Sequence, residues 1–251
     1  MTSLDLLAGT ASAGTLYGIG VGPGDVRYLT LRAAGLVRAV DVVAFFAKKG
    51  AQGNARRIVS PLLVGQAEQR LEYPVTDEMP ADSAEYHRQI GDFYRESADL
   101  LAGLLRHGKS VGLLAEGDPF FYGSFMHMWR RLAADFPVEV VPGVTGMSGC
   151  WTRAKTPITW GDDMLAVLPG TLSESALVER LRLTDAAVIM KVGRNLAKVR
   201  RAVEAAGLLS RAVYVERGTM EDERIVPLAD CGEGRGAYFA MVLIPGEGRR
   251  I

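Results

Sequence analysis

Short apolar runs alternate with amphipathic stretches along most of the 251-residue chain. The runs at 16–21, 41–46 and 110–115 have the length of buried strands, and glycine, proline or polar residues flank them. The longest amphipathic stretch, 83–108, keeps its apolar residues near one face of a helix, and Gly108 ends it as a C-terminal glycine does. Strands that alternate with helices in this way predict an α/β fold.

The alternation starts again in the second half of the chain, after Pro157 and the polar segment 160–163. Strands are predicted there at 164–170, 186–192, 211–218, 224–228 and 237–245. The last two are expected to pair with each other as an antiparallel ending. We therefore predict two successive α/β domains, 1–156 and 157–251, with residues 1–14 as a loose extension.

Charge and composition narrow the classes of function. The chain has 29 basic and 29 acidic residues, so it lacks the positive field that dominates nucleic-acid binding. No apolar run approaches the ~20 residues that span a bilayer, and the N-terminus has no basic region typical of a signal peptide. We expect a cytoplasmic protein with neither a nucleic-acid nor a membrane partner.

The cysteines and histidines do not form a recognisable metal site. Cys150 and Cys231 lie far apart in the sequence, and we expect two free, buried thiols in a reducing compartment. His87, His107 and His127 are isolated from one another. The sequence therefore predicts no bound metal.

Residues 103–110, "GLLRHGKS", match the phosphate-loop pattern G-x-x-x-x-G-K-[ST]. A nucleotide-dependent enzyme would need this segment to leave a strand and open a helix. Here the order is reversed, because the segment ends a predicted helix and starts a predicted strand. We interpret Lys109 as a solvated lysine that offsets the helix dipole. A nucleotide-dependent function is therefore disfavoured. Loss of activity in the variant Lys109→Ala would favour that function again.

Three glycine-rich segments leave predicted strands at their carboxyl ends: 18–25, 115–123 and 141–146. Loops at this end of an α/β sheet usually form the ligand site, so three such exits indicate a shared crevice. Glu116 and Asp118 can bind a cation or an amino group. The alternative for Asp118 is that it only stabilises the Asp-Pro turn before a helix.

Five motifs in order, "GIGVGPGD", "EGDPFFYG", "VEVVPGVTG", "IMKVGRN" and "VERGT", resemble the tetrapyrrole methylases. These are S-adenosylmethionine-dependent enzymes of corrin and sirohaem synthesis. The resemblance runs from about residue 16 to 244. It implies two α/β domains with the cofactor in the cleft between them, a tetrapyrrole substrate and a homodimer.

Within the family, the segments 48–63, 116–129 and 141–172 are most similar to the branch that methylates C-20 of precorrin-2 in aerobic cobalamin synthesis. The branch that methylates cobalt-factor II at C-20 is the nearest alternative, and a non-catalytic tetrapyrrole-binding module is a third. Uroporphyrinogen methylases typically read "RGG" where this chain has residues 124–126, so that branch is disfavoured. They also carry an acidic residue where this chain has Phe46 and Ala47, so no acid–base residue can be transferred.

The resemblance also implies site residues. The implied cofactor contacts are Pro23, Glu116, Gly117, Asp118, Phe121, Thr145, Gly146, Met190 and Gly218. The residues alone would make Met190 a core strand residue and Gly218 a turn. The candidates for a base are Tyr122, His127 and Glu116. The substrate has eight carboxylates, and the basic residues expected to bind them are Arg27, Lys48, Lys49, Arg56, Arg57 and Arg153. The alternative for the residues at 48–57 is a solvated basic loop.

Overall fold

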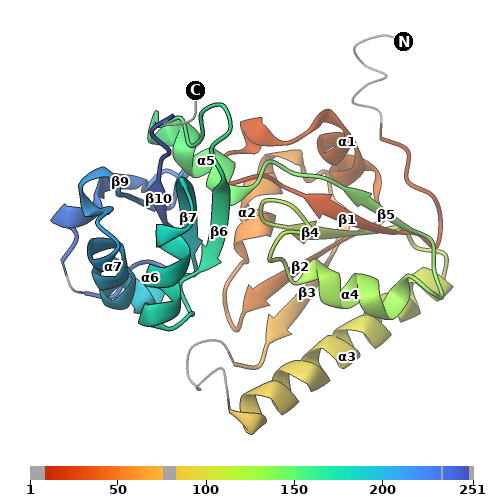
Figure 1. Cartoon of the computed structure of the whole chain (residues 1–251). Helices are drawn as coiled ribbons and strands as arrows, with labels where there is room; N and C mark the ends of the chain where they lie inside the picture. Colours follow the sequence, from red (N-terminus) through yellow and green to blue (C-terminus); the bar gives the residue numbers. More distant parts are fainter. Residues whose placement is uncertain (1–8, 76–82, 233, 249–251) are drawn as a thin grey trace. The chain divides into compact units, whose positions relative to one another are not determined.

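The computed structural model describes residues 9–75, 83–232 and 234–248 of the chain. The chain divides into two compact units, residues 1–145 and 146–251 (Figure 1). Each unit contains one five-stranded sheet with helices packed on it. The predicted α/β fold with two successive sheets is therefore confirmed.

The first unit has a wholly parallel sheet in the order β3-β2-β4-β1-β5. Its strands are β1 (Leu16–Gly20), β2 (Val42–Lys48), β3 (Ala67–Tyr73), β4 (Val111–Ala115) and β5 (Val138–Val141). Its helices are α1 (Leu31–Ala39), α2 (Asn54–Val59), α3 (Ala84–Arg106) and α4 (Phe125–Leu132), with short 3₁₀ turns at Val26–Tyr28 and Ser60–Leu62. Helices on both faces bury the central strands completely, which explains why β1 and β4 are almost continuously apolar.

Alternate residues of each strand belong to different cores. Leu16 and Leu113 pack with α3 and α4 on one face, whereas Tyr17 and Leu114 pack with α1 and α2 on the other. The alternation follows from the two-residue period of a strand.

The long amphipathic helix is confirmed as α3, and it shows why the phosphate-loop match carries no function. Ser83 caps its first turn, and the chain leaves its last turn at Gly108, which has a φ of 73°. β4 then starts at Val111. Residues 103–110 therefore run from helix to strand and offer no helix N-terminus to a phosphate.

Strand β3 was not predicted from the sequence. Among the described strands it pairs only with β2, at the edge of the sheet, and of its seven residues only Leu71 is buried. An edge strand needs little apolar surface, so its sequence "AEQRLEY" lacks the apolar run that marks a central strand.

The second unit has a mixed sheet in the order β6-β7-β10-β8-β9. Its strands are β6 (Leu165–Pro169), β7 (Ala186–Met190), β8 (Val213–Glu216), β9 (Arg224–Pro227) and β10 (Ala240–Ile244). Its helices are α5 (Gly146–Arg153), α6 (Glu174–Arg182) and α7 (Leu196–Ala205), with 3₁₀ turns at Gly193–Asn195, Leu209–Arg211 and Leu228–Asp230. β9 and β10 are both antiparallel to β8 and lie on either side of it. The expectation that they pair with each other was wrong.

Helix α5 belongs to the second unit, because Cys150 packs with Val188, Val215 and Leu243 of its sheet. The division of the chain therefore lies at residues 145–146, ahead of the position at 156–157 expected from Pro157 and the polar segment after it. Among the residues that the structure describes, none of the helices is both long and apolar enough to cross a membrane.

Candidate active site

The three glycine-rich loops meet at one end of the first sheet. β1 lies between β4 and β5 and is parallel to both, so all three loops leave the same edge. The Gly22 amide donates to the Gly117 carbonyl at 3.3 Å, and the Gly117 amide donates to the Gly22 carbonyl at 2.8 Å. A Cβ on Gly143 would lie 2.0 Å from the Gly117 carbonyl oxygen, and one on Gly20 would lie 2.6 Å from the Gly143 nitrogen. The backbones of the three glycine-rich loops therefore pack directly against one another, as expected for loops that leave the same edge of the sheet.

Asp118 ties two of these loops together. Its Oδ1 accepts a hydrogen bond from the Phe120 amide at 2.9 Å, which stabilises the turn. Its Oδ2 accepts one from the Gly143 amide at 3.1 Å, which holds the loop after β5. The turn-stabilising role named as the alternative is therefore present. Because each carboxylate oxygen can accept a second hydrogen bond, it does not compete with a ligand contact.

Glu116 follows β4 directly; the residue as a whole is exposed, but its carboxyl group contacts the backbone of α2 and is surrounded by protein atoms. Its Oε1 accepts a hydrogen bond from the Ala55 amide at the start of α2 at 3.2 Å. Desolvation raises the pKa of Glu116 above its ordinary value of 4.5, and the hydrogen bonds from its own amide and that of Ala55 oppose this rise. The carboxyl group can therefore exchange a proton closer to neutral pH than an ordinary glutamate can.

The other two candidates for a base lie on the same segment. Tyr122 is 45% exposed and has a φ of 54°, in the left-handed region that non-glycine residues rarely adopt. His127 lies in the first turn of α4, where its ring stacks on that of Tyr94 with centroids 3.9 Å apart. Desolvation, followed by the charges of Arg131 and Arg130, lowers the pKa of His127, so its imidazole is neutral at pH 7.

Two further implied contacts lie in the loops of this unit. Pro23 is buried between Gly22 and Gly24, which have φ values of 76° and 155°. Phe121 is half-buried and makes an edge contact with the ring of Tyr122, with centroids 4.9 Å apart. Both residues shape the loops around the glycines.

Ser124, Tyr73 and Tyr94 form a hydroxyl cluster beside this segment that the sequence did not reveal. Tyr73 Oη lies 2.5 Å and Tyr94 Oη 3.2 Å from Ser124 Oγ. A serine before a helix is ordinarily read as a cap, and Tyr73 lies on the unpredicted strand β3. No local signal in the sequence could have joined the three residues.

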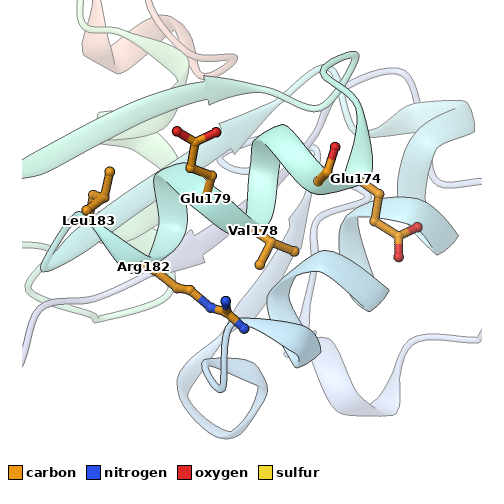
Figure 2. Close-up of a pocket in the computed structure, with 6 residues that line it drawn as sticks. Glu174, Val178, Glu179, Arg182 and Leu183 are labelled. Atoms are coloured by element: carbon orange, nitrogen blue, oxygen red, sulfur yellow. The ribbon is translucent and has the colours of Figure 1, made fainter.

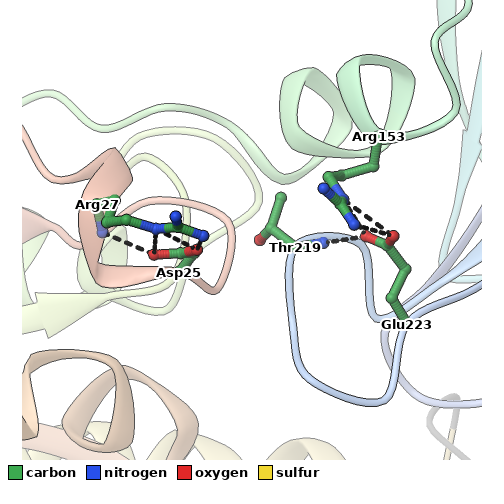
Figure 3. Close-up of polar contacts among 5 residues, drawn as sticks. All are labelled: Asp25, Arg27, Arg153, Thr219 and Glu223. Atoms are coloured by element: carbon green, nitrogen blue, oxygen red, sulfur yellow. Dashed lines mark hydrogen bonds and ion pairs between the residues drawn. The ribbon is translucent and has the colours of Figure 1, made fainter.

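Two of the predicted substrate arginines of this unit already hold carboxylates of the protein. Arg27 donates to both oxygens of Asp25, which in turn accepts from the Arg27 amide (Figure 3). Arg56 makes a two-pronged ion pair with Glu68 of β3, at 3.0 and 2.8 Å. A substrate carboxylate at either arginine would have to share or replace this partner. The other three residues of this unit that were predicted to bind substrate carboxylates are exposed: Lys48, Lys49 and Arg57.

In the second unit, an ion pair braces the loop after β8. Arg153 of α5 donates to both oxygens of Glu223, and Glu223 accepts a hydrogen bond from the Thr219 amide at 2.7 Å (Figure 3). The hydrogen bond from Arg153 is the main reason why the pKa of Glu223 lies below its ordinary value. Arg217 and Thr219 have φ values of 50° and 71°, so the loop is held in an unusual backbone conformation.

Gly218 and Thr219 in this loop differ in what surrounds them. A Cβ on Gly218 would lie 2.8 Å from Cys150 Sγ, so only glycine fits. The Oγ1 atom of Thr219 is buried and has no hydrogen-bond partner among the described residues. An unpaired buried hydroxyl is costly, and a ligand that bonds to it would remove that cost.

The remaining implied contacts lie at strand and helix ends. Met190 ends β7 and is half-buried against the cluster around Cys150, which agrees with its interpretation as a core strand residue. Thr145 precedes α5, and Gly146 begins it; a Cβ on Gly146 would lie 3.0 Å from Met241 Cε, the end of a flexible side chain that would have to shift slightly. Burial raises the pKa of Cys150 to about 12, so its thiol stays protonated.

The second unit also has a shallow hollow of about 690 Å³ along α6 (Figure 2). Its lining residues are Glu174, Ser175, Val178, Glu179, Arg182 and Leu183. None of the predicted site residues lines it, and the hollow offers neither a glycine loop nor a buried polar group to a ligand. The loops at the strand ends therefore remain the candidate site.

Comparison with known proteins gives matches along nearly the whole chain. The sequence model of the Tetrapyrrole (Corrin/Porphyrin) Methylases matches residues 15–231. A precorrin-2 C(20)-methyltransferase from Sinorhizobium sp. is 52% identical over 93% of this chain and 96% of that protein. A cobalt-precorrin-2 C(20)-methyltransferase from Salmonella typhimurium is 31% identical over 92% and 96%, respectively. The structure of uroporphyrin-III C-methyl transferase from Thermus thermophilus, complexed with S-adenyl homocysteine, has the same fold, with a TM-score of 0.62, 23% identity and coverage of 94% of this chain and 99% of that chain.

Proposed function

The chain belongs to the tetrapyrrole (corrin/porphyrin) methylase family, a family of S-adenosylmethionine-dependent methyltransferases, and we propose that it methylates C-20 of precorrin-2. The observation that carries this proposal is the 52% identity to the Sinorhizobium enzyme over nearly the full length of both chains. The identity to the Salmonella enzyme named for the cobalt-containing substrate is 31%, which favours the metal-free substrate.

S-Adenosylmethionine would supply an activated methyl group on a sulfonium centre and would leave as S-adenosylhomocysteine. The chain's own residues fit such a molecule in two respects. The Glu116 carboxylate, beside the interlocked glycines, is a partner for an ammonium group. The buried Thr219 hydroxyl, which has no partner in the described chain, can bond to a polar atom of the ligand. The proposed contacts are those implied by the resemblance: Pro23, Glu116, Gly117, Asp118, Phe121, Thr145, Gly146, Met190 and Gly218.

Cys150 would not compete with the substrate for the methyl group. Its thiol lies against the backbone of Gly218, one of the proposed contacts, and a thiolate there would be a strong nucleophile. With a pKa of about 12 the thiol stays protonated at pH 7. The protein therefore keeps a soft nucleophile beside the donor in its unreactive form.

Methylation at C-20 requires loss of a proton from that carbon, and three residues remain candidates to accept it. Glu116 has a raised pKa, which makes its carboxylate a stronger base than usual. His127 is neutral at pH 7 and can accept a proton. Tyr122 lies between Glu116 and His127 in the sequence, and its side chain is exposed.

For the substrate carboxylates we propose six basic residues. Three are exposed at and after the carboxyl end of β2: Lys48, Lys49 and Arg57. Arg27, Arg56 and Arg153 each bind a carboxylate of this chain, which a substrate carboxylate would have to share or replace. We also propose a homodimer in the cytoplasm, which light scattering of the purified protein and fractionation of cells can test.

The function is tested by anaerobic incubation with a labelled methyl donor and precorrin-2, followed by location of the label. We expect one labelled methyl group at C-20. Cobalt-factor II and uroporphyrinogen III serve as controls in parallel reactions. If only cobalt-factor II is labelled, the enzyme belongs to the cobalt-dependent branch. If the protein binds the methyl donor but labels none of the tetrapyrroles, the proposed substrate is wrong.

A further inference from the structure

Ser124 does not act as the helix cap that its position suggests. It directly precedes α4, where a serine hydroxyl ordinarily accepts a hydrogen bond from an amide of the first turn, but it makes no such bond. Its Oγ instead bonds to Tyr73 Oη at the end of β3, at 2.5 Å, and to Tyr94 Oη on α3, at 3.2 Å. The hydroxyl therefore joins three elements of the first unit.

Ring packing fixes the positions of both tyrosine hydroxyls. Tyr73 stacks on Phe46 with centroids 5.6 Å apart and lies 4.7 Å from the ring of Phe93. Tyr94 is buried, makes an edge contact with Phe46 at 6.3 Å and stacks on His127 at 3.9 Å. Neither ring can swing without disturbing its neighbours, so Ser124 is held by rigid partners.

Residues 116–124 form a loop that is held independently near both ends. Asp118 fixes the first half through the Phe120 and Gly143 amides. Ser124 fixes the last residue. Between these two anchors, Tyr122 adopts a φ of 54° and exposes 45% of its surface. A non-glycine residue keeps this backbone conformation only where its surroundings impose it.

We propose that Ser124 is a positioning residue that acts through Tyr122. By anchoring the end of the loop to Tyr73 and Tyr94, it holds the ring of Tyr122 where it contacts the tetrapyrrole. A tyrosine offers a flat apolar ring and a polar tip, which suits a flat macrocycle with polar substituents. This inference rests on the proposed function. It adds a role for a residue outside the predicted donor contacts.

Four variants separate this role from a general effect on folding. Ser124→Ala removes the anchor without removing a cap, and Tyr73→Phe removes its shorter hydrogen bond. Ser124→Thr keeps a hydroxyl and should recover part of the effect. The matched control is Ser173→Ala, because Ser173 does cap its helix, α6, through the Ala176 amide at 3.2 Å.

The first readout is hydrogen–deuterium exchange of the amides at 122–124, which needs no substrate. Ser124→Ala and Tyr73→Phe should exchange faster there, whereas Ser173→Ala should change only the start of α6. The second readout separates donor binding from turnover. Ser124→Ala should lower kcat about tenfold, because small misplacement of a positioned group is costly. It should leave the Kd of S-adenosylhomocysteine unchanged, because Asp118 still holds the first half of the loop.

Unchanged exchange at 122–124 in Ser124→Ala would overturn the proposal, and so would a parallel loss of kcat and of affinity for S-adenosylhomocysteine. If the native enzyme methylates no tetrapyrrole, the proposed function fails. In that case faster exchange at 122–124 would still support the anchor, and Tyr122→Ala would then be tested for loss of tetrapyrrole binding. Retained tetrapyrrole affinity in Tyr122→Ala would overturn the assignment of that residue.

Discussion

Gly143→Ala tests whether close backbone packing of the three loops builds the site. A Cβ at this position would lie 2.0 Å from the Gly117 carbonyl oxygen, against 3.4 Å or more for an ordinary contact. Both partners are backbone, so no side chain can rotate out of the way. The loops must separate by more than 1 Å.

The magnitude follows from the hydrogen bonds that this separation breaks. Gly117 and Gly22 exchange two backbone hydrogen bonds, and the Gly143 amide donates a third to Asp118. At about 1 kcal/mol for each neutral bond and somewhat more for the bond to a carboxylate, the variant should lose about 3 kcal/mol of folding free energy. For a chain of this size that corresponds to a fall in Tm of roughly 6–12 °C.

The assay combines thermal unfolding with calorimetric titration of S-adenosylhomocysteine. Gly103→Ala is the matched control, because it lies in α3 with no atom within 4 Å of the added Cβ. Alanine there should raise stability by about 1 kcal/mol. The control also alters the phosphate-loop match, so normal activity would exclude a role for that segment. If Gly143→Ala unfolds at the same temperature as the native protein and binds S-adenosylhomocysteine equally well, the reasoning from backbone packing is refuted.

Three further predictions concern single groups. Asp118→Asn should destabilise the protein by about 2 kcal/mol, measured by urea unfolding, because an amide nitrogen must then face one of the two backbone donors; equal stability would contradict the turn role. Cys150 should resist iodoacetamide at pH 8 in the folded protein, since its pKa is about 12, and should react on unfolding. Because the folded-state pKa of Glu223 is lowered, its contribution to stability is complete above its ordinary value of 4.5 and is lost as the pH falls through the lowered pKa. Arg153→Ala should reduce this acid dependence, as seen in Tm measured between pH 7 and 3.

The sequence by itself determined the features that depend on local pattern. The periodicity of α3, its end at Gly108 and the apolar strands β1 and β4 were all correctly predicted. The order of helix and strand around 103–110 was enough to reject a phosphate loop. The glycine-rich exits were expected at one edge because parallel strands bring their carboxyl ends together.

Only the tertiary structure decided which distant residues meet. The edge strand β3 has almost no apolar signal, so neither it nor Tyr73 could be placed from the sequence. From the sequence, Asp118 can be recognised only as a turn residue. The structure shows that it also accepts a hydrogen bond from the Gly143 amide, in the loop after another strand. From the sequence, Ser124 is expected to cap a helix. In the structure its hydroxyl is instead hydrogen-bonded to the hydroxyls of Tyr73 and Tyr94. Periodicity and capping are properties of neighbouring residues, whereas these contacts depend on strand order and helix packing, which no short stretch of sequence encodes.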